Sequence, residues 1–224
     1  MYRERLTIKI IKNMENYLYC YKMTWDTESA PNPHHNVLTL AICKPAIRRG
    51  AQVGDWISGW TAKLVNGKDN ELHAFDNPRL IYLAKIKAKL TFAEYWEQYP
   101  QKRPQIIGYN EVTTSKKTCG KAKNITKAIY DSGDNIYKPE ADGSYTQVEN
   151  NNHTEIEKEH DLSGKYVLIC EEFYYYGVNN AQKIERNIFD VTVPRCKKIP
   201  LDDQCHMLIN YIKNDSHVQI KREV

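Results

Sequence analysis

The residues best suited to bind or transform a ligand lie between positions 38 and 62 of the 224-residue chain. A basic connector in this stretch carries three cations that could hold a phosphate group, namely Lys44, Arg48 and Arg49. The planar guanidinium group of arginine matches the geometry of phosphate oxygens. The alternative is a solvated loop, since surface cations need no partner.

Two tryptophans follow in the same stretch, after a turn formed by Gly54 and Asp55. Trp56 and Trp60 fall on one face of a predicted strand, because strand side chains alternate with a period of two. A tryptophan that stacks on a nucleobase contributes ~1–3 kcal/mol, and Trp25 in an earlier strand could act in the same way. Packing in a core is the alternative for each tryptophan. Asp55 could accept a hydrogen bond from a base amino group, or it could cap its own turn.

Four further residues lie in loops and carry groups that can read the edge of a base: Asn32, Asp134, Asn135 and Tyr137. The asparagine amide can donate and accept at the same time, as base edges require. Turn formation by the same side chains is the alternative. We therefore expect the base-binding set to be Trp25, Asn32, Trp56, Trp60, Asp134, Asn135 and Tyr137.

An enzymatic site is a second possibility, because Asp26, Asp55 and Asp134 could converge for acid–base chemistry without leaving a motif. The sequence has no zinc-deaminase signature, no phosphate-binding P-loop and no dinucleotide fingerprint. No serine or cysteine stands in a recognisable nucleophile context. The six cysteines form no CxxC pair and the seven histidines lack ligand spacing, so we expect no metal and no cofactor.

Composition limits the partners of the chain. A net charge of +4 is mild, so affinity for a polyanion must come from local clusters. Hydrophobic residues make up 41% of the chain, and its mean hydropathy is −0.68, as for a folded core with added polar loops.

The N-terminal residues are too charged for a signal peptide, and no apolar run approaches ~18 residues. We therefore expect a cytoplasmic protein with reduced cysteines and no membrane contact. Cys20, Cys43 and Cys170 fall in apolar strand patterns, where cysteine is an ordinary small core residue.

Period-two alternation predicts most of the elements that must position these residues. Strands are expected over residues 17–25, 37–43, 56–65, 79–90 and 166–176. A helix begins after Thr91, where the spacing to Glu94 is that of a capping box. A second helix follows Pro200 and carries Leu201, Cys205, Leu208, Ile209 and Ile212 on one face. This order of elements predicts an α+β fold with a small curved sheet or barrel and peripheral helices.

The predicted domain organisation has three parts. Residues 1–15 are a charged extension, residues 16–200 a domain, and residues 201–224 a C-terminal helix and tail. Long polar insertions interrupt the domain at about 101–132 and 140–163, where periodicity is lost.

Six blocks carry a family resemblance: APNP (30–33), TLAICKPAIR (39–48), GDWI (54–57), RLIY (79–82), TFAEYW (91–96) and GDNIY (133–137). In this order they resemble the nucleotide modification associated domain 2 family, with weaker similarity in DLSGKYVLIC (161–170) and YYGVN (175–179). The resemblance implies a role in making or handling modified nucleobases in DNA. The layout of residues 44–59 is also similar to PUA-like and EVE-type domains, which implies that an aromatic cage holds a base.

Taken together, the resemblance and the residues predict a PUA-like module that recognises a modified base through an aromatic pocket with a cationic rim. Its partner would be nucleic acid, DNA rather than RNA, or a modified nucleotide, in a nucleotide-modification or phage-defence pathway. The pocket is expected between the Trp56–Trp60 strand, the loop 26–35 and the segment 134–139. The alternative function is an enzyme that tailors the base through its aspartates.

Overall fold

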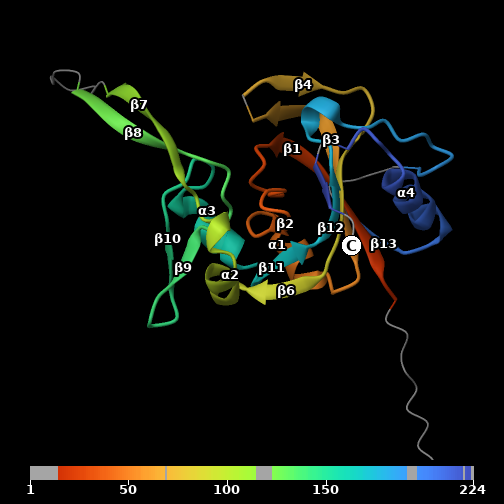
Figure 1. Cartoon of the computed structure of the whole chain (residues 1–224), viewed down its shortest axis with the longest axis horizontal. Coiled ribbons are helices and arrows are strands. Elements are labelled where there is room, and N and C mark those ends of the chain that lie inside the picture. Colours follow the sequence, from red (N-terminus) through yellow and green to blue (C-terminus); the bar gives the residue numbers. More distant parts are fainter. Residues whose placement is uncertain (1–14, 69, 115–122, 191–195, 219, 223–224) are drawn as a thin grey trace, which may run out of the picture.

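The structure is a computed structural model that describes residues 15–68, 70–114, 123–190, 196–218 and 220–222 (Figure 1). All but the last residue of the expected extension, 1–15, lies outside the described residues. The described part contains both helices and strands, which confirms the predicted α+β class. None of its sheets closes into a barrel, which leaves the sheet alternative.

The main sheet has seven strands, six of them in the order β13–β1–β3–β5–β12–β14, while β4 pairs with the end of β3. Their bounds are β1 Tyr17–Asp26, β3 Trp56–Gly67, β4 Leu72–Ala74, β5 Leu80–Lys85, β12 Glu172–Tyr175, β13 Cys196–Pro200 and β14 Ile220–Arg222. β1 and β3 run parallel, and the other pairs are antiparallel. β1 and β3 are buried along most of their length, because these central strands meet a hydrophobic core on each face.

A second sheet of three strands has the order β2–β11–β6. It consists of β2 Leu38–Leu40, β11 Tyr166–Cys170 and β6 Ala88–Thr91. The single strands predicted over 79–90 and 166–176 were wrong, because each is two strands in different sheets. The chain turns at Ile86, whose N–H donates to the Asp55 carbonyl, and Lys87 N–H then donates to Ile169 in the second sheet. Ala88 and Leu90 of β6 still pack, partly buried, against a hydrophobic cluster, so the apolar pattern continues through the bend and hides it.

The basic connector that carries Lys44, Arg48 and Arg49 is not the solvated loop that was the alternative to a phosphate clamp. It contains the helix α1, Pro45–Gly50, with Ile47 and Arg48 buried. Proline suits the first turn of a helix because its missing N–H would have no partner there. The preceding strand ends at Leu40 rather than at residue 43. Cys43 and Lys44 form the turn into α1 with left-handed backbone, at φ 57° and 44°.

The other helices are α2 Phe92–Gln98, α3 Glu155–Leu162 and α4 Asp203–Lys213, with short 3-10 turns η1 Pro100–Lys102 and η2 Val178–Asn180. The capping box of Thr91 and Glu94 is confirmed at the start of α2. α4 buries four of the predicted apolar residues, Cys205, Leu208, Ile209 and Ile212. No helix in the described ranges is both long and apolar enough to cross a membrane.

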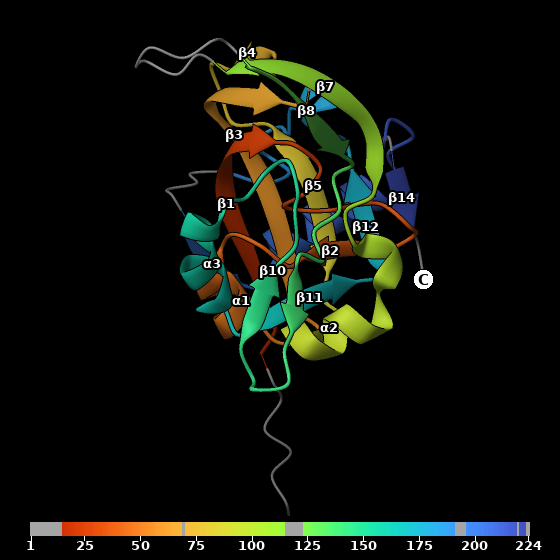
Figure 2. The same cartoon turned by 90° about the vertical axis from the view of Figure 1, so that its left-hand side faces the viewer.

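The basic insertion at about 101–132 has regular structure, which our prediction missed. β7 Ile106–Thr114 and β8 Lys123–Tyr130 form an antiparallel hairpin that projects away from the main sheet (Figures 1 and 2). The second insertion, 140–163, includes β10 Tyr145–Gln147, which pairs with β9 Tyr137–Pro139, and also α3. Polar residues face solvent on both sides of such small elements, so hydrophobic periodicity is weak.

Three hydrophobic clusters hold these elements together. One lies between the main sheet and β2 and α1, and another between the second sheet, α2 and β9. The third lies on the other face of the main sheet, where α4 covers Trp56 and Trp60. Figure 1 accordingly shows α4 on one side of the main sheet and α1, α2 and α3 on the other.

Candidate functional site

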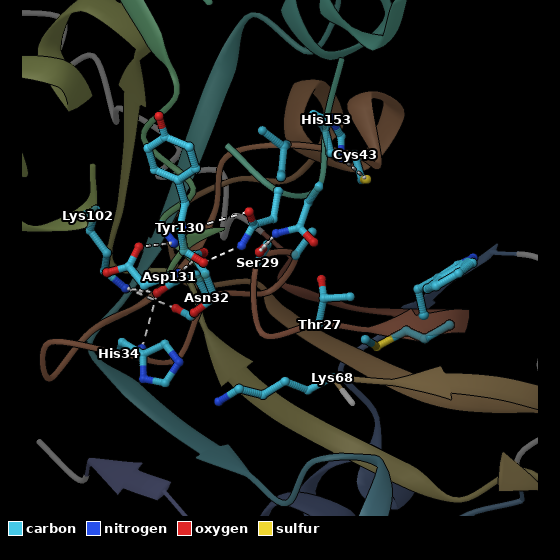
Figure 3. A pocket seen from close by; sticks show the side chains of 18 of the residues that line it. Thr27, Ser29, Asn32, His34, Cys43, Lys68, Lys102, Tyr130, Asp131 and His153 are labelled. Atoms are coloured by element: carbon cyan, nitrogen blue, oxygen red, sulfur yellow. Dashed lines mark hydrogen bonds between the residues drawn. The ribbon is translucent and has the colours of Figure 1, made fainter. Parts of the chain in front are cut away.

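A cavity of about 1050 Å³ opens beside the C-terminal end of β1 (Figure 3). Its walls come from segments that are distant in sequence: the end of β1, the loop 27–35, the turn 42–44, the turn after β3 with Lys68 and Asn70, the base of the β7–β8 hairpin with residues 131–133, and the loop 151–153. Lys102 contributes from η1. Chemically different side chains line it, among them Trp25, Lys44, Lys68, Tyr130 and His153. Ligand sites of this size are usually concave and carry few polar groups at defined places.

Trp25 supplies the exposed aromatic surface of the cavity. Its side chain is 54% exposed at the end of β1, although large apolar side chains usually avoid water. The Lys44 ammonium group lies 4.8 Å from the centre of the Tyr21 ring, and both residues line the cavity. Trp25 and Lys44 are thus the predicted aromatic and phosphate-binding residues that the structure brings together.

Trp56 and Trp60 lie elsewhere, in the core beneath α4. Trp60 is fully buried, stacks on Phe189 with ring centres 6.0 Å apart, and donates from Nε1 to Ser58 Oγ at 2.9 Å. Trp56 is 5% exposed in the same cluster. The cavity therefore does not include the Trp56–Trp60 face, and we do not propose these two residues as ligand contacts.

Asn32 lines the cavity, but its amide is bonded to the protein. Nδ2 donates to the Ser132 carbonyl at 2.8 Å, and Oδ1 accepts from Lys102 Nζ at 2.6 Å. Lys102 also donates to the carbonyls of Asn32 and Val37 at 3.0 and 2.7 Å. Burial lowers the pKa of Lys102 to about 8, although the nearby Asp134 carboxylate opposes this shift. Lys102, which sequence reasoning missed, thus fixes the loop 27–35 from beneath.

Asp134, Asn135 and Tyr137 are buried behind the cavity rather than in its lining. Asp134 accepts from Thr39 Oγ1 at 2.7 Å and from Tyr95 Oη at 2.6 Å, and burial raises its pKa. Asn135 Nδ2 donates to the Tyr95 carbonyl at 3.0 Å. These contacts tie the segment 134–137 to α2, while the adjacent Ser132 and Gly133 line the cavity.

Arg48 and Arg49 do not form a phosphate clamp in this structure. Arg48 is fully buried and donates to the carbonyls of Cys43, Tyr166 and Asp161 at 2.7, 2.8 and 2.5 Å. Burial lowers the pKa of Arg48 to about 10, although the Asp161 carboxylate opposes this shift. Arg49 is exposed and donates to the Ser163 carbonyl at 2.6 Å. Neither arginine lines the cavity.

The aspartates of the enzymatic alternative are held apart. Asp26 accepts from Tyr175 Oη at 2.8 Å and from Val178 N–H at 2.7 Å, and burial raises its pKa. Asp55 accepts from the N–H groups of Tyr17 and Gln52, both at 2.8 Å, and so caps the turn before β3. None of Asp26, Asp55 and Asp134 lines the cavity.

A different titratable group lies in the cavity wall. Cys43 Sγ is 3.5 Å from His153 Nε2, and His153 Nδ1 is 2.7 Å from Asp161 Oδ2. The carboxylate lies off the line of the Nδ1–H bond, so the contact is an ion pair rather than a linear hydrogen bond. Burial disfavours the charged imidazole, but the Asp161 carboxylate and Cys43 outweigh it and raise the pKa of His153 to about 10.

Sequence reasoning missed this group because Cys43 is 110 positions away from His153. The expectation that Cys43 is a core residue of a strand was wrong, because it lies half-buried in the turn before α1. The available signal was the order of the residues: an apolar strand, then Cys43, Lys44 and Pro45. A proline that can open a helix just after a strand indicates a strand–turn–helix connection.

The raised pKa of His153 predicts a pH-dependent contribution to stability. The folded protein favours the charged imidazole, so this contribution is complete below the unfolded pKa of about 6.5. It is lost as the pH rises through about 10. His153→Gln should therefore lower the melting temperature most in mildly acidic buffer, and the difference from wild type should shrink towards that upper pH. Thermal melts across the pH range measure it, with the exposed His206→Gln on α4 as the control. A constant difference would contradict the ion pair.

Comparison with known proteins gives one result. A family model described as nucleotide modification associated domain 2 matches residues 14–221. Neither curated proteins nor solved structures give a match. The match confirms the resemblance carried by the six sequence blocks and extends it over nearly the whole chain.

Proposed function

Because the chain belongs to the nucleotide modification associated domain 2 family, we propose that the cavity beside Trp25 recognises a modified nucleobase. The family name associates the chain with nucleotide modification, and the cavity is where a base would fit. The single observation that carries the proposal is Trp25, a half-exposed tryptophan in the wall of a cavity large enough for a nucleotide. A tryptophan face stacks on any base and tolerates substituents at its edge.

The charges around the cavity support an anionic ligand. Lys44 and Lys68 both line it, and Lys68 is 61% exposed. Glu28 accepts from His34 Nε2 and from Lys68 Nζ, each at 2.9 Å. The His34 hydrogen bond, helped by Lys68, lowers the pKa of Glu28 to about 2 in spite of its burial. Part of the positive charge is thus already paired, which leaves Lys44 as the better candidate for a phosphate contact.

Polar groups can complete the recognition of the base edge. Asn152 Nδ2 donates to Ser29 Oγ at 2.6 Å across the cavity wall, and both residues line it. Asn151 Nδ2 donates to the Tyr130 carbonyl, which fixes the loop 151–153 to the β7–β8 hairpin. Asn151 Oδ1 also accepts from Tyr130 N–H at 3.1 Å, so the Asn152 amide oxygen is the better candidate to accept from a base amino group. We place the base in DNA, where it would have to leave its stack to enter a cavity of this kind.

Titration with short single-stranded oligodeoxynucleotides tests the proposal. Each would carry one 5-substituted pyrimidine or N6-substituted adenine and be compared with its unmodified counterpart and with the free nucleotide. Trp25→Ala should weaken binding of the preferred oligonucleotide about tenfold or more. Trp96→Ala is the matched control, because Trp96 is partly exposed, lies outside the cavity and packs on Arg103 with its guanidinium carbon 4.1 Å from the ring centre.

The salt dependence of binding tests the phosphate contact, and a comparison of oligonucleotide with free nucleotide tests whether the base is bound in DNA. Lys44→Ala should reduce the slope of log K against log salt by about 0.7–0.9 for an oligonucleotide that places a phosphate at Lys44. Tight binding of the free nucleotide alone would move the proposal from DNA to a nucleotide pool. Equal affinity of wild type and Trp25→Ala for every probe would overturn it.

A further inference from the structure

We propose that Cys43 is the nucleophile of an acyl-transfer site in the cavity wall, with His153 as its acid–base partner and Asp161 as a positioning residue. This goes beyond recognition of a base, because it assigns the cavity a covalent reaction. The substrate class is an acyl compound, such as an ester, thioester or amide, and an acyl group carried by the bound nucleotide would meet this requirement. Only the acyl group on a bound nucleotide depends on the proposed function; the acyl-transfer site itself does not.

The position of Cys43 differs from that of the other described cysteines. Cys20, Cys170 and Cys205 are fully buried, as is usual for free thiols. Cys43 is half-buried and is the one described cysteine that lines the cavity. It stands between the end of β2 and the start of α1 with a φ of 57°. A sharp strand-to-helix turn of this kind holds a nucleophile out toward the ligand.

His153 and Asp161 form the relay that activates such a nucleophile. His153 Nε2 lies 3.5 Å from the sulfur, and Nδ1 forms an ion pair with the Asp161 carboxylate at 2.7 Å. A nucleophile, a base and a third group that orients the base are the parts of a triad, whatever their order in sequence. Transfer of the thiol proton to His153 would give the thiolate, which is the reactive form.

The Asp161 carboxylate is held in place by groups from three other segments. Oδ1 accepts from Cys43 N–H at 2.6 Å and lies 3.9 Å from Arg48 Nη2, while Oδ2 accepts from Tyr137 Oη at 2.9 Å. Asp161 is fully buried, and these donors together with His153 outweigh burial and lower its pKa. It therefore stays charged and keeps the imidazole protonated. The same carboxylate binds the backbone of the nucleophile, so it sets the positions of both Cys43 and His153.

The reaction that this geometry supports is balanced without a further reagent. The Cys43 thiolate attacks the acyl carbon and forms a C–S bond. The bond from carbon to the leaving group breaks, and His153 Nε2 gives its proton to the leaving group. Water, an alcohol or an amine then attacks the thioester, gives a proton to His153 and releases the thiolate. The amide that follows the nucleophile donates to the oxyanion in such turns, and here it is the Lys44 N–H.

The full-length protein can be tested with p-nitrophenyl acetate, which supplies an acyl group and a visible leaving group. We expect a burst of p-nitrophenol and one added acetyl group on Cys43 by peptide mass spectrometry. Cys43→Ala should abolish both, and His153→Gln should slow the burst about 100-fold or more. Cys196→Ala is the matched control, because Cys196 is exposed on β13 and lies outside the cavity. The test needs no nucleic acid, so it can succeed or fail independently of base recognition.

The rate of alkylation by iodoacetamide distinguishes a triad from an accessible thiol. Other titratable groups near Cys43 and His153 are Tyr21, Lys44, Arg48 and Tyr137. Burial raises the pKa of both tyrosines and lowers the pKa of Arg48 only to about 10. At pH 6, wild-type Cys43 should be alkylated at least about tenfold faster than Cys196, because His153 lies beside the sulfur and can take its proton. If His153→Gln does not fold, this wild-type comparison decides the question.

Two outcomes would overturn the proposal. One is acetylation of Cys43 no faster than that of Cys196. The other is alkylation of wild-type Cys43 at pH 6 that is no faster than alkylation of Cys196.

Discussion

Replacing Arg48 with alanine is expected to lower the free energy of unfolding by about 3–5 kcal/mol, the usual cost of removing one partner of a buried ion pair. The side chain is fully buried, and its three kinds of nitrogen donate to the carbonyls of Cys43, Tyr166 and Asp161. Without the guanidinium group, these carbonyls and the Asp161 carboxylate would be buried with fewer partners. Arg48 also fills the space beside Gly164, where a Cβ atom would lie 2.4 Å from the guanidinium carbon.

Arg49→Ala provides the matched control for this experiment. Arg49 is the next residue of the same helix, carries the same charge and is exposed, with its bond to the Ser163 carbonyl at the surface. Its loss should change stability by no more than about 1 kcal/mol. Urea unfolding of the two variants and the wild type gives the comparison directly. Similar stabilities for both variants would show that Arg48 does not have the buried contacts described above.

The pair of arginines shows how far sequence can predict this fold. Composition and spacing correctly indicate a cationic stretch before a turn, but they cannot tell a buried arginine from an exposed one. The difference lies in Asp161, which is 113 positions from Arg48. Local signals with both partners nearby were predicted well, such as the Thr91–Glu94 capping box at the start of α2. Contacts between residues that are far apart in the sequence leave no such local signal.

The strands also show what a sequence pattern can and cannot predict. Alternation identifies β1 and the strand that carries Trp56 and Trp60, because period two depends only on the neighbouring residues. It cannot show where β5 bends into β6, since apolar residues of both strands pack against hydrophobic clusters. It also cannot show what covers a face. The tryptophan face was expected to meet the loop 26–35, whereas α4, which begins at Asp203, covers it.

The candidate site was predictable only in part. Trp25 and Lys44 were expected as ligand contacts and line the cavity, and Asn32 lies there with its amide engaged. Lys102, His153 and Asp161 had no distinguishing pattern in the sequence. Each acts through partners in other segments, and these contacts form only when the chain is folded.

Trp60→Ala is expected to cost about 3–5 kcal/mol of stability, because it leaves a large cavity in a packed core. Trp60 is fully buried against Phe189 and under α4, and its Nε1 bond to Ser58 would be lost as well. For a chain of this length, that loss corresponds to a fall of very roughly 10 °C in melting temperature. Trp25→Ala removes the same side chain from a site that is 54% exposed, so its stability should change by about 1 kcal/mol or less.

The two tryptophan variants separate core from ligand site when stability and binding are measured together. Trp25→Ala should melt close to wild type and bind the modified oligonucleotide more weakly. Trp60→Phe keeps part of the stack on Phe189 and should fall between the wild type and Trp60→Ala in stability, while the folded protein still binds. A Trp60→Ala protein that melts like the wild type but no longer binds would reverse the assignment. It would place the ligand on the face of the main sheet that α4 covers.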